Sequence, residues 1–166
     1  MQLFILDEDP GRAAGMLCDV HLRKMCLETA QILSSVLFLQ GRELAEGMPR
    51  CYNPRHPVIQ AINTPQKICW TVECNEALHR EYVFRFGRKH AYWDLCAKYR
   101  QLLWCSDITW RREDLSFARS FKGIKITEPD IIFAYRAYYR FKKKQLRHWT
   151  YTNTAEPDWL KEKTAV

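Results

Sequence analysis

Residues 19–31 read DVHLRKMCLETAQ and predict the central helix of the fold. Four polar side chains in this stretch lie three, four and three positions apart, those of His21, Lys24, Glu28 and Gln31. At about 3.6 residues per turn, this spacing places all four on one face of a helix. The apolar residues between them fall mostly on adjoining faces, which can pack against a core. We therefore expect a helix that packs against the core through its apolar faces and presents one polar face, which is a candidate site.

This polar face has two interpretations. In the first, Glu28, His21 and Lys24 are the catalytic residues of an acid/base site and Gln31 is a substrate ligand. In the second, Lys24 and Glu28 are an ordinary surface pair four residues apart, which stabilises a helix by roughly a few tenths of a kcal/mol. The helix alone does not distinguish them.

Cap residues and apolar spacing predict the elements on either side of this helix, which should extend to about Gln40 and end at Gly41. An apolar, extended segment at residues 3–6 and a brief helix starting at Pro10 should precede it. Further helices are expected at residues 65–86, 90–104 and 127–149. Residues 106–125 have no clean period and are expected to be mostly loop.

The predicted fold class is therefore mainly α: a single compact helical domain of four to five helices with a short N-terminal extended segment. A chain of 166 residues with 47% hydrophobic content is long enough to bury a core as one domain, residues 1–166, with the last roughly 15 residues as a polar tail. No run approaches the roughly 18 apolar residues of a membrane span, and no signal peptide is recognisable. We expect a cytoplasmic protein, in the host cytoplasm if phage-encoded, with no membrane partner.

Cysteine and histidine spacing bears on metal binding. The seven cysteines form no CxxC pair, and the five histidines form no HxxxH or HxH pair. We therefore expect free, mostly buried thiols in a reducing compartment. The sequence predicts neither a metal site nor a cofactor.

The charge distribution favours a polyanionic partner, DNA or a nucleotide. The net charge is +7, and basic side chains that neutralise phosphates release counterions and strengthen binding. Basic and aromatic residues alternate late in the chain, where Arg136, Tyr139 and Lys143 share a helix face and are predicted to bind phosphate.

Two further segments carry candidate substrate ligands. Arg55 and His56 precede a proline in a loop, from which they can reach a ligand held by rigid helices. Glu81 and Arg85 lie four residues apart, with His90 beyond the end of their helix, and together predict a second polar wall. Alternatively, Glu81 and Arg85 are a surface pair and His90 caps the next helix. No phosphate-loop, dinucleotide-binding or nucleophile-elbow motif is present.

The segment DVHLRKMCLE resembles the first long helix of the small, all-helical phage pyrimidine-dimer DNA glycosylases of the endonuclease V type. In that family an Asp-x-His-Leu element is followed, seven residues after the His, by the catalytic Glu. Asp19, His21 and Leu22 match, and Glu28 has the matching position. Outline similarity continues through about residues 15–90, including Arg55, His56, Pro57, Glu81, Arg85, Phe86 and Gly87. The chain is also similar to uncharacterised phage proteins with DP, DKHxxKMxLExxQ, HP, EYxxRYGxxH and YRxYY elements.

The resemblance implies chemistry at an N-glycosidic bond, with Glu28 stabilising an oxocarbenium-like centre. The nucleophile of that family is an α-amine exposed when Met is removed before a small residue, whereas Gln2 is large and should leave Met1 in place. Two arginines that flank the catalytic Glu in the family are Leu27 and Gln31 here. Attack by Lys24, or by water that Glu28 activates, therefore both remain open.

Three functions follow from these observations. The leading hypothesis is a phage-type enzyme that acts on an N-glycosidic bond of nucleic acid or nucleotide, in which His21, His56 and Arg85 shape the pocket around Glu28. The first alternative is a non-catalytic binder of nucleotides or nucleic acid, such as one that sequesters a host signalling nucleotide. The second is a host-takeover interaction protein whose contacts are Trp104, Trp110 and Trp159.

Overall fold

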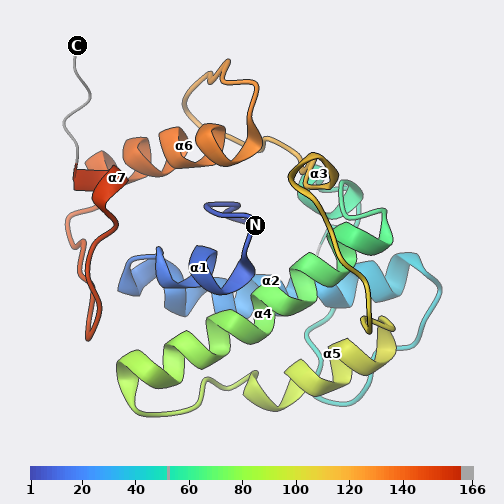
Figure 1. Ribbon diagram of the computed structural model, residues 1–166. Helices are drawn as coiled ribbons and strands as arrows, with labels where there is room; N and C mark the ends of the chain where they lie inside the picture. Colours follow the sequence, from blue (N-terminus) through green and yellow to red (C-terminus); the bar gives the residue numbers. More distant parts are fainter. Residues whose placement is uncertain (52, 162–166) are drawn as a thin grey trace.

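The computed structural model describes residues 1–51 and 53–161. Its elements, in chain order, are α1 (Pro10–Gly15), α2 (Asp19–Leu39), α3 (Pro57–Gln60), α4 (Pro65–Phe86), the 3-10 turn η1 (Trp93–Leu95), α5 (Cys96–Leu102), the 3-10 turn η2 (Arg112–Asp114), α6 (Ile131–Gln145) and α7 (Asp158–Lys161), as Figure 1 shows. The described residues contain no β-strand. The predicted mainly α fold class is confirmed.

The long helices α2 and α4 pack against each other at the centre of the molecule (Figure 1). The apolar face of α2 is buried, as the spacing predicted, and contributes Leu22, Met25 and Leu33 to the core. The predicted caps of α4 are also present. The Thr64 side chain accepts a hydrogen bond from the Lys67 backbone N–H, and Gly87 ends the helix at a φ of 65°, a left-handed conformation that glycine adopts without strain.

The N-terminal segment lies between α2 and α6 (Figure 1). It forms neither helix nor strand, and its apolar residues 3–6 are all buried. Phe4 shows the arrangement most clearly, because its ring centroid is 5.1 Å from that of His21 on α2 and 5.0 Å from that of Tyr139 on α6. The first residues of the chain are therefore part of the core and form one side of a cavity described below.

Several predicted helix bounds were wrong. Helix α6 begins at Ile131 because the Asp130 side chain accepts the backbone N–H groups of Ile132 and Phe133, and it ends at Gln145, not near Trp149. The helix expected over residues 90–104 is confined to η1 and α5. The helices α3 and α7 were not predicted, because one helical turn is too short to show a period.

Part of the predicted polar tail packs against the helices. The hydroxyls of Thr150 and Thr152 donate hydrogen bonds of 3.0 and 2.7 Å to Oδ2 of Asp19, at the start of α2. Leu160 of α7 is buried in the core. The rest of that segment, residues 162–166, lies outside the described residues.

All seven cysteines are free thiols, and five of them are buried, namely Cys18, Cys26, Cys69, Cys74 and Cys105. This agrees with the prediction of free, mostly buried thiols. In the part of the chain that the structure describes, no helix combines the length and the apolar composition that crossing a membrane would need.

Candidate functional site

A cavity of about 720 Å³ lies between α2, α6, the N-terminal segment and the loop before α6. Four residues singled out in the sequence, His21, Lys24, Glu28 and His56, meet at its wall. The full lining comprises Met1, Gln2, Phe4, His21, Lys24, Met25, Glu28, His56, Ser120, Lys122, Gly123, Tyr138, Lys142 and Gln145. The polar face of α2 therefore faces a cavity along the part that contains Glu28.

Three nitrogen atoms surround the carboxylate of Glu28. Its Oε2 accepts a 2.9 Å hydrogen bond from the backbone N–H of Gln2. Its Oε1 lies 3.3 Å from Nζ of Lys24 and 3.9 Å from the α-amino nitrogen of Met1. The side chain of Glu28 is only 10% exposed, whereas that of Lys24 is 61% exposed. The two residues thus do form an i,i+4 ion pair, but its acidic member is a buried carboxylate at the cavity wall.

His21 is held by Tyr139 behind the cavity. The Tyr139 hydroxyl accepts the backbone N–H of Cys18 at 2.9 Å and lies 3.0 Å from Nδ1 of His21. Because the hydroxyl proton needs an acceptor in this buried position, Tyr139 donates to Nδ1 and leaves the imidazole proton on Nε2. Burial, together with Lys142 and Lys24, lowers the pKa of His21 to about 4. His21 is therefore a neutral imidazole with an N–H donor at neutral pH.

His56 is positioned by the short helix α3. It is the N-cap residue, and its Nδ1 accepts the backbone N–H of Val58 at 3.2 Å. Burial and the N-terminal ammonium lower the pKa of His56, against an opposing effect of Glu28. Because Nδ1 accepts this capping hydrogen bond, the proton of the neutral ring is on Nε2. His56 is thus a second neutral N–H donor at this cavity.

The remaining lining supplies positive charge and aromatic surface. Lys122 and Lys142 add two ammonium groups to that of Lys24, so three lysines and one glutamate line the cavity. The rings of Phe4 and Tyr138 lie 6.3 Å apart between centroids and are stacked. Ammonium groups bind phosphate oxygens, and aromatic rings stack on nucleobases. The arrangement can therefore accommodate a nucleotide unit, and its volume falls within the roughly 300–1,000 Å³ of small-ligand sites.

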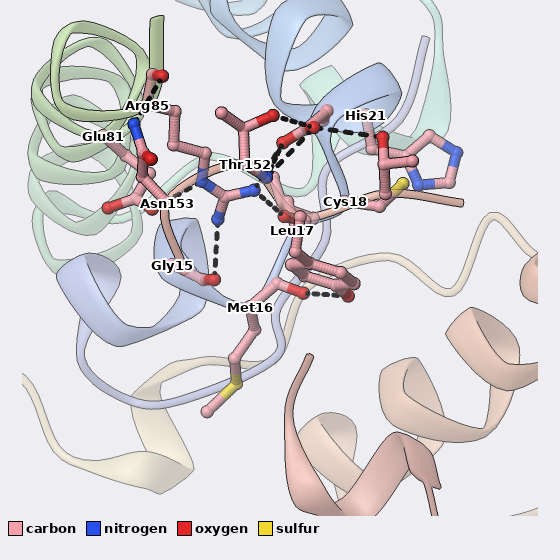
Figure 2. A network of polar contacts seen from close by, with 12 residues as sticks. Gly15, Met16, Leu17, Cys18, His21, Glu81, Arg85, Thr152 and Asn153 are labelled. Carbon is pink, nitrogen blue, oxygen red and sulfur yellow. Dashed lines mark hydrogen bonds and ion pairs between the residues drawn. The ribbon is translucent and has the colours of Figure 1, made fainter. Parts of the chain in front are cut away.

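Arg85 does not reach this cavity, contrary to the prediction. Its side chain is fully buried, and its guanidinium donates to the carbonyls of Leu17 and Gly15 at 2.7 and 2.8 Å. It also pairs with Asp19 at 3.1 Å and with Glu81 at 2.7 Å. Figure 2 shows these contacts tying α4 to the connection between α1 and α2. Arg85 and Glu81 therefore have structural contacts where a substrate-binding wall was expected.

The same network includes the segment after α6. Burial raises the pKa of Asp19, but hydrogen bonds from Thr152, Arg85 and Thr150 lower it, and the net pKa is below the usual value. Asn153 donates a 3.2 Å hydrogen bond to the carbonyl of Arg85 (Figure 2). Asp19, which matches the glycosylase motif, thus anchors the start of α2 and places the residues that follow it.

The predicted phosphate-binding face of α6 is divided among separate contacts. Arg136 donates to the carbonyl of Leu6 at 2.8 Å and pairs with Asp7 at 3.3 Å, beside a different cavity of about 510 Å³. Lys143 pairs with Glu156. Tyr139 is buried behind His21, so the three residues predicted to act together do not share a ligand site.

Three other predicted ligands also lie away from the 720 Å³ cavity. The described residues that line this cavity do not include Gln31, Arg55 or His90. Gln31 is half-buried farther along α2, and Arg55 is exposed beside His56. His90 packs against Tyr82, with ring centroids 5.1 Å apart, after the end of α4.

The three tryptophans proposed as partner contacts differ in exposure. Trp104 is 74% exposed. The indole N–H of Trp110 donates to the carbonyl of Glu8 at 3.2 Å, and the Trp159 ring lies 5.2 Å from the guanidinium of Arg136. Trp110 and Trp159 are therefore engaged within the protein.

Several residues that line the cavity were not predicted as ligands, chiefly Gln2, Phe4, Lys122 and Lys142. Only Lys142 gave a signal, as part of the late basic cluster. Comparisons of the chain with protein-family models, with curated proteins and with solved structures give no match. Any functional assignment therefore depends on the chemistry of the cavity and on the motif resemblance.

Proposed function

We propose that this protein cleaves an N-glycosidic bond in nucleic acid or in a nucleotide, with Glu28 as the catalytic carboxylate. The observation that carries this proposal is the burial of Glu28 at a cavity whose other charged side chains are three lysines. The match of His21, Leu22 and Glu28 to the glycosylase helix supports the same assignment.

Each part of the cavity has a role in binding such a substrate. Lys24, Lys122 and Lys142 attract phosphate groups, and phosphate contacts position a nucleic acid without reading its sequence. Phe4 and Tyr138 offer aromatic surface to a base removed from its stack. The neutral N–H donors of His21 and His56 are suited to carbonyl oxygens and ring nitrogens of that base.

Glu28 supplies the electrostatic component of catalysis. As the bond between the base nitrogen and the anomeric carbon breaks, positive charge develops on the sugar, and a fixed carboxylate stabilises that charge. In the route with water as the nucleophile, a water molecule then forms the new bond to the anomeric carbon. Its proton passes to Glu28 and from there to the departing base, so the products are the free base and the sugar with a hydroxyl group.

Release of free base is the direct test. The protein is incubated with duplex DNA containing modified or damaged bases and with a panel of nucleotides, and the products are separated by liquid chromatography. Turnover in the unaltered protein that falls by at least about 100-fold in Glu28→Gln supports the proposal. Glu43→Gln is the matched control, because Glu43 is an exposed glutamate outside the cavity.

Borohydride trapping identifies the nucleophile. A reduced covalent adduct mapped to Lys24 or to the α-amine of Met1 would show that an amine attacks the sugar. Base release without any adduct would show that water does.

The same assay separates the alternatives. Tight nucleotide binding without products would replace the proposal by a sequestering function, which the three lysines also favour. Absence of both binding and release across the panel would reject a nucleotide ligand and leave protein interaction as the function to examine.

A further inference from the structure

A second cluster of chemically active side chains lies outside the proposed catalytic cavity. It consists of Cys26 on α2, His79 on α4 and His90 in the turn after α4. One sulfur or nitrogen atom from each residue lies within 4.8 Å of those of the other two. Ligand atoms of a tetrahedral zinc ion lie roughly 3.5 Å apart. Movements of about an ångström would therefore bring all three to one ion.

The hydrogen bonding of His79 leaves one ring nitrogen available. Nδ1 lies 2.7 Å from the backbone carbonyl of Asn75, which can only accept, so Nδ1 carries the proton. Nε2 then presents a lone pair, and this atom is buried without a hydrogen-bond partner in the described structure. His79 itself is completely buried. A buried polar atom without a partner destabilises the fold, and a metal ion would supply the missing partner.

The neighbouring groups fit the pattern of metal sites. A ligating histidine commonly donates its other N–H to a carbonyl or carboxylate, as His79 does to Asn75. The ring centroids of His79 and His90 are 5.5 Å apart, with an angle of 77° between the ring planes, and no hydrogen bond joins the two rings at Nε2 of His79. Nδ1 of His90 accepts a long, 3.3 Å hydrogen bond from the backbone N–H of Tyr92. Coordination through Nδ1 of His90 would replace this weak contact by a metal bond. Coordination through Nε2 would have the same result, because the ring proton would then be on Nδ1, which could no longer accept.

We propose that Cys26, His79 and His90 bind a zinc-class divalent ion. One thiolate and two imidazoles are a ligand set that suits Zn²⁺. On binding, the Cys26 thiol loses its proton to solvent and its sulfur bonds to the metal. His90 is half-buried, so ion entry and a fourth, water ligand are expected on its side of the site.

The position of the site indicates a structural role. Cys26 is two residues from both Lys24 and Glu28, which corresponds to roughly 200° around the helix. The metal would therefore lie on the opposite side of α2 from the cavity and would tie the turn after α4 to α2. No short-spacing motif in the sequence marks this site, because Cys26 and His79 come from different helices. This inference is independent of the proposed glycosidic activity.

The test is metal binding by the full chain after treatment with a chelator. Co²⁺ is added as a spectroscopic probe, and Zn²⁺ affinity is measured by competition with a chromophoric chelator. We expect one ion per chain and a thiolate-to-cobalt charge-transfer band. Cys26→Ala should abolish that band, and His90→Gln should weaken Zn²⁺ binding by more than about 10-fold. Because His90 is half-buried, its variant remains informative if Cys26→Ala fails to fold.

Matched controls distinguish this site from adventitious binding. Cys69→Ser alters another buried thiol, about 15 Å along α4 from His79, and His56→Gln alters another half-buried histidine. Both should retain the affinity and the cobalt band. Zn²⁺ should also raise the melting temperature of the unaltered chain and of both controls, but not that of His90→Gln. Failure to bind one ion, or equal loss in the controls, would overturn the proposal.

Discussion

The backbone N–H of Gln2 donates a 2.9 Å hydrogen bond to Oε2 of Glu28, so the first residues of the chain orient a carboxylate in α2. Oε1 of the same group lies 3.3 Å from the Lys24 ammonium. Each carboxylate oxygen thus has its own partner. A fixed orientation matters for catalysis because a charge that is already positioned needs little reorganisation during the reaction.

Removing the donor at residue 2 should therefore weaken catalysis. Gln2→Pro has no backbone N–H, and a hydrogen bond to a charged group contributes about 1.5–3 kcal/mol. We expect base release to fall by roughly 10-fold or more. Gln2→Ala is the control, because it loses the same side chain and keeps the N–H. Both variants are made in a cell-free system without methionine aminopeptidase, because Met1 would otherwise be removed before a small residue. Equal activity of the two variants would show that this hydrogen bond has no catalytic role.

The lysines of the cavity should contribute to binding through phosphate. Lys142→Ala is expected to weaken the affinity for a short single-stranded oligonucleotide and to reduce the slope of log affinity against log salt by about 0.7. Lys144→Ala removes an exposed lysine from the same helix, outside the cavity lining, and should change the slope less. Fluorescence anisotropy over a salt series measures both. Equal effects would indicate diffuse attraction by the basic surface.

The buried His21 should make stability depend on pH. Its pKa is about 4 in the folded protein, and 6.5 is the ordinary value. Between these values the unfolded chain binds a proton that the folded chain does not, so stability falls as the pH is lowered from 6.5 toward 4. Above 6.5 both states are neutral and the effect is absent. The greatest loss is about 3 kcal/mol.

Comparison with His21→Gln isolates this effect. The difference in unfolding free energy between the unaltered chain and this variant should be constant above pH 7 and should shift toward the variant as the pH falls. Urea unfolding in chelator-treated samples across the pH range measures it. A difference that does not change with pH would contradict the assignment of His21 as a buried neutral imidazole.

Arg85 should be essential to stability, with no direct part in substrate binding. Arg85→Met leaves the buried carboxylate of Asp19 without its cation and the carbonyls of Leu17 and Gly15 without a donor, so a loss of about 3–5 kcal/mol is expected. Arg80→Met removes the exposed member of another pair on α4 and should cost less than about 1 kcal/mol. Denaturant unfolding compares the two. Similar costs would refute the structural role of Arg85.

The sequence predicted the parts of this structure that depend on local spacing. The helical period placed His21, Lys24 and Glu28 on one face, and the residues at both ends of α4 marked its limits correctly. His56 was found because a residue before proline in a loop is confined and accessible. These signals need only a few neighbouring residues.

The remaining features depend on distant contacts. Glu81 and Arg85 have the spacing of a surface pair, and nothing local shows that Arg85 is buried against Gly15 and Leu17. Gln2 contributes through its backbone N–H, which every residue except proline has. Lys122 lies in a loop without a period, so only the folded chain brings it to the cavity.

Glu28→Gln tests the central claim most directly. The variant retains nearly the same shape and an oxygen that can accept the Gln2 N–H, but it lacks the negative charge. We predict that it binds a nucleic-acid substrate with unaltered or greater affinity and releases base at least about 100-fold more slowly. Base release by Glu28→Gln at the rate of the unaltered protein would contradict the role of Glu28 as the catalytic carboxylate.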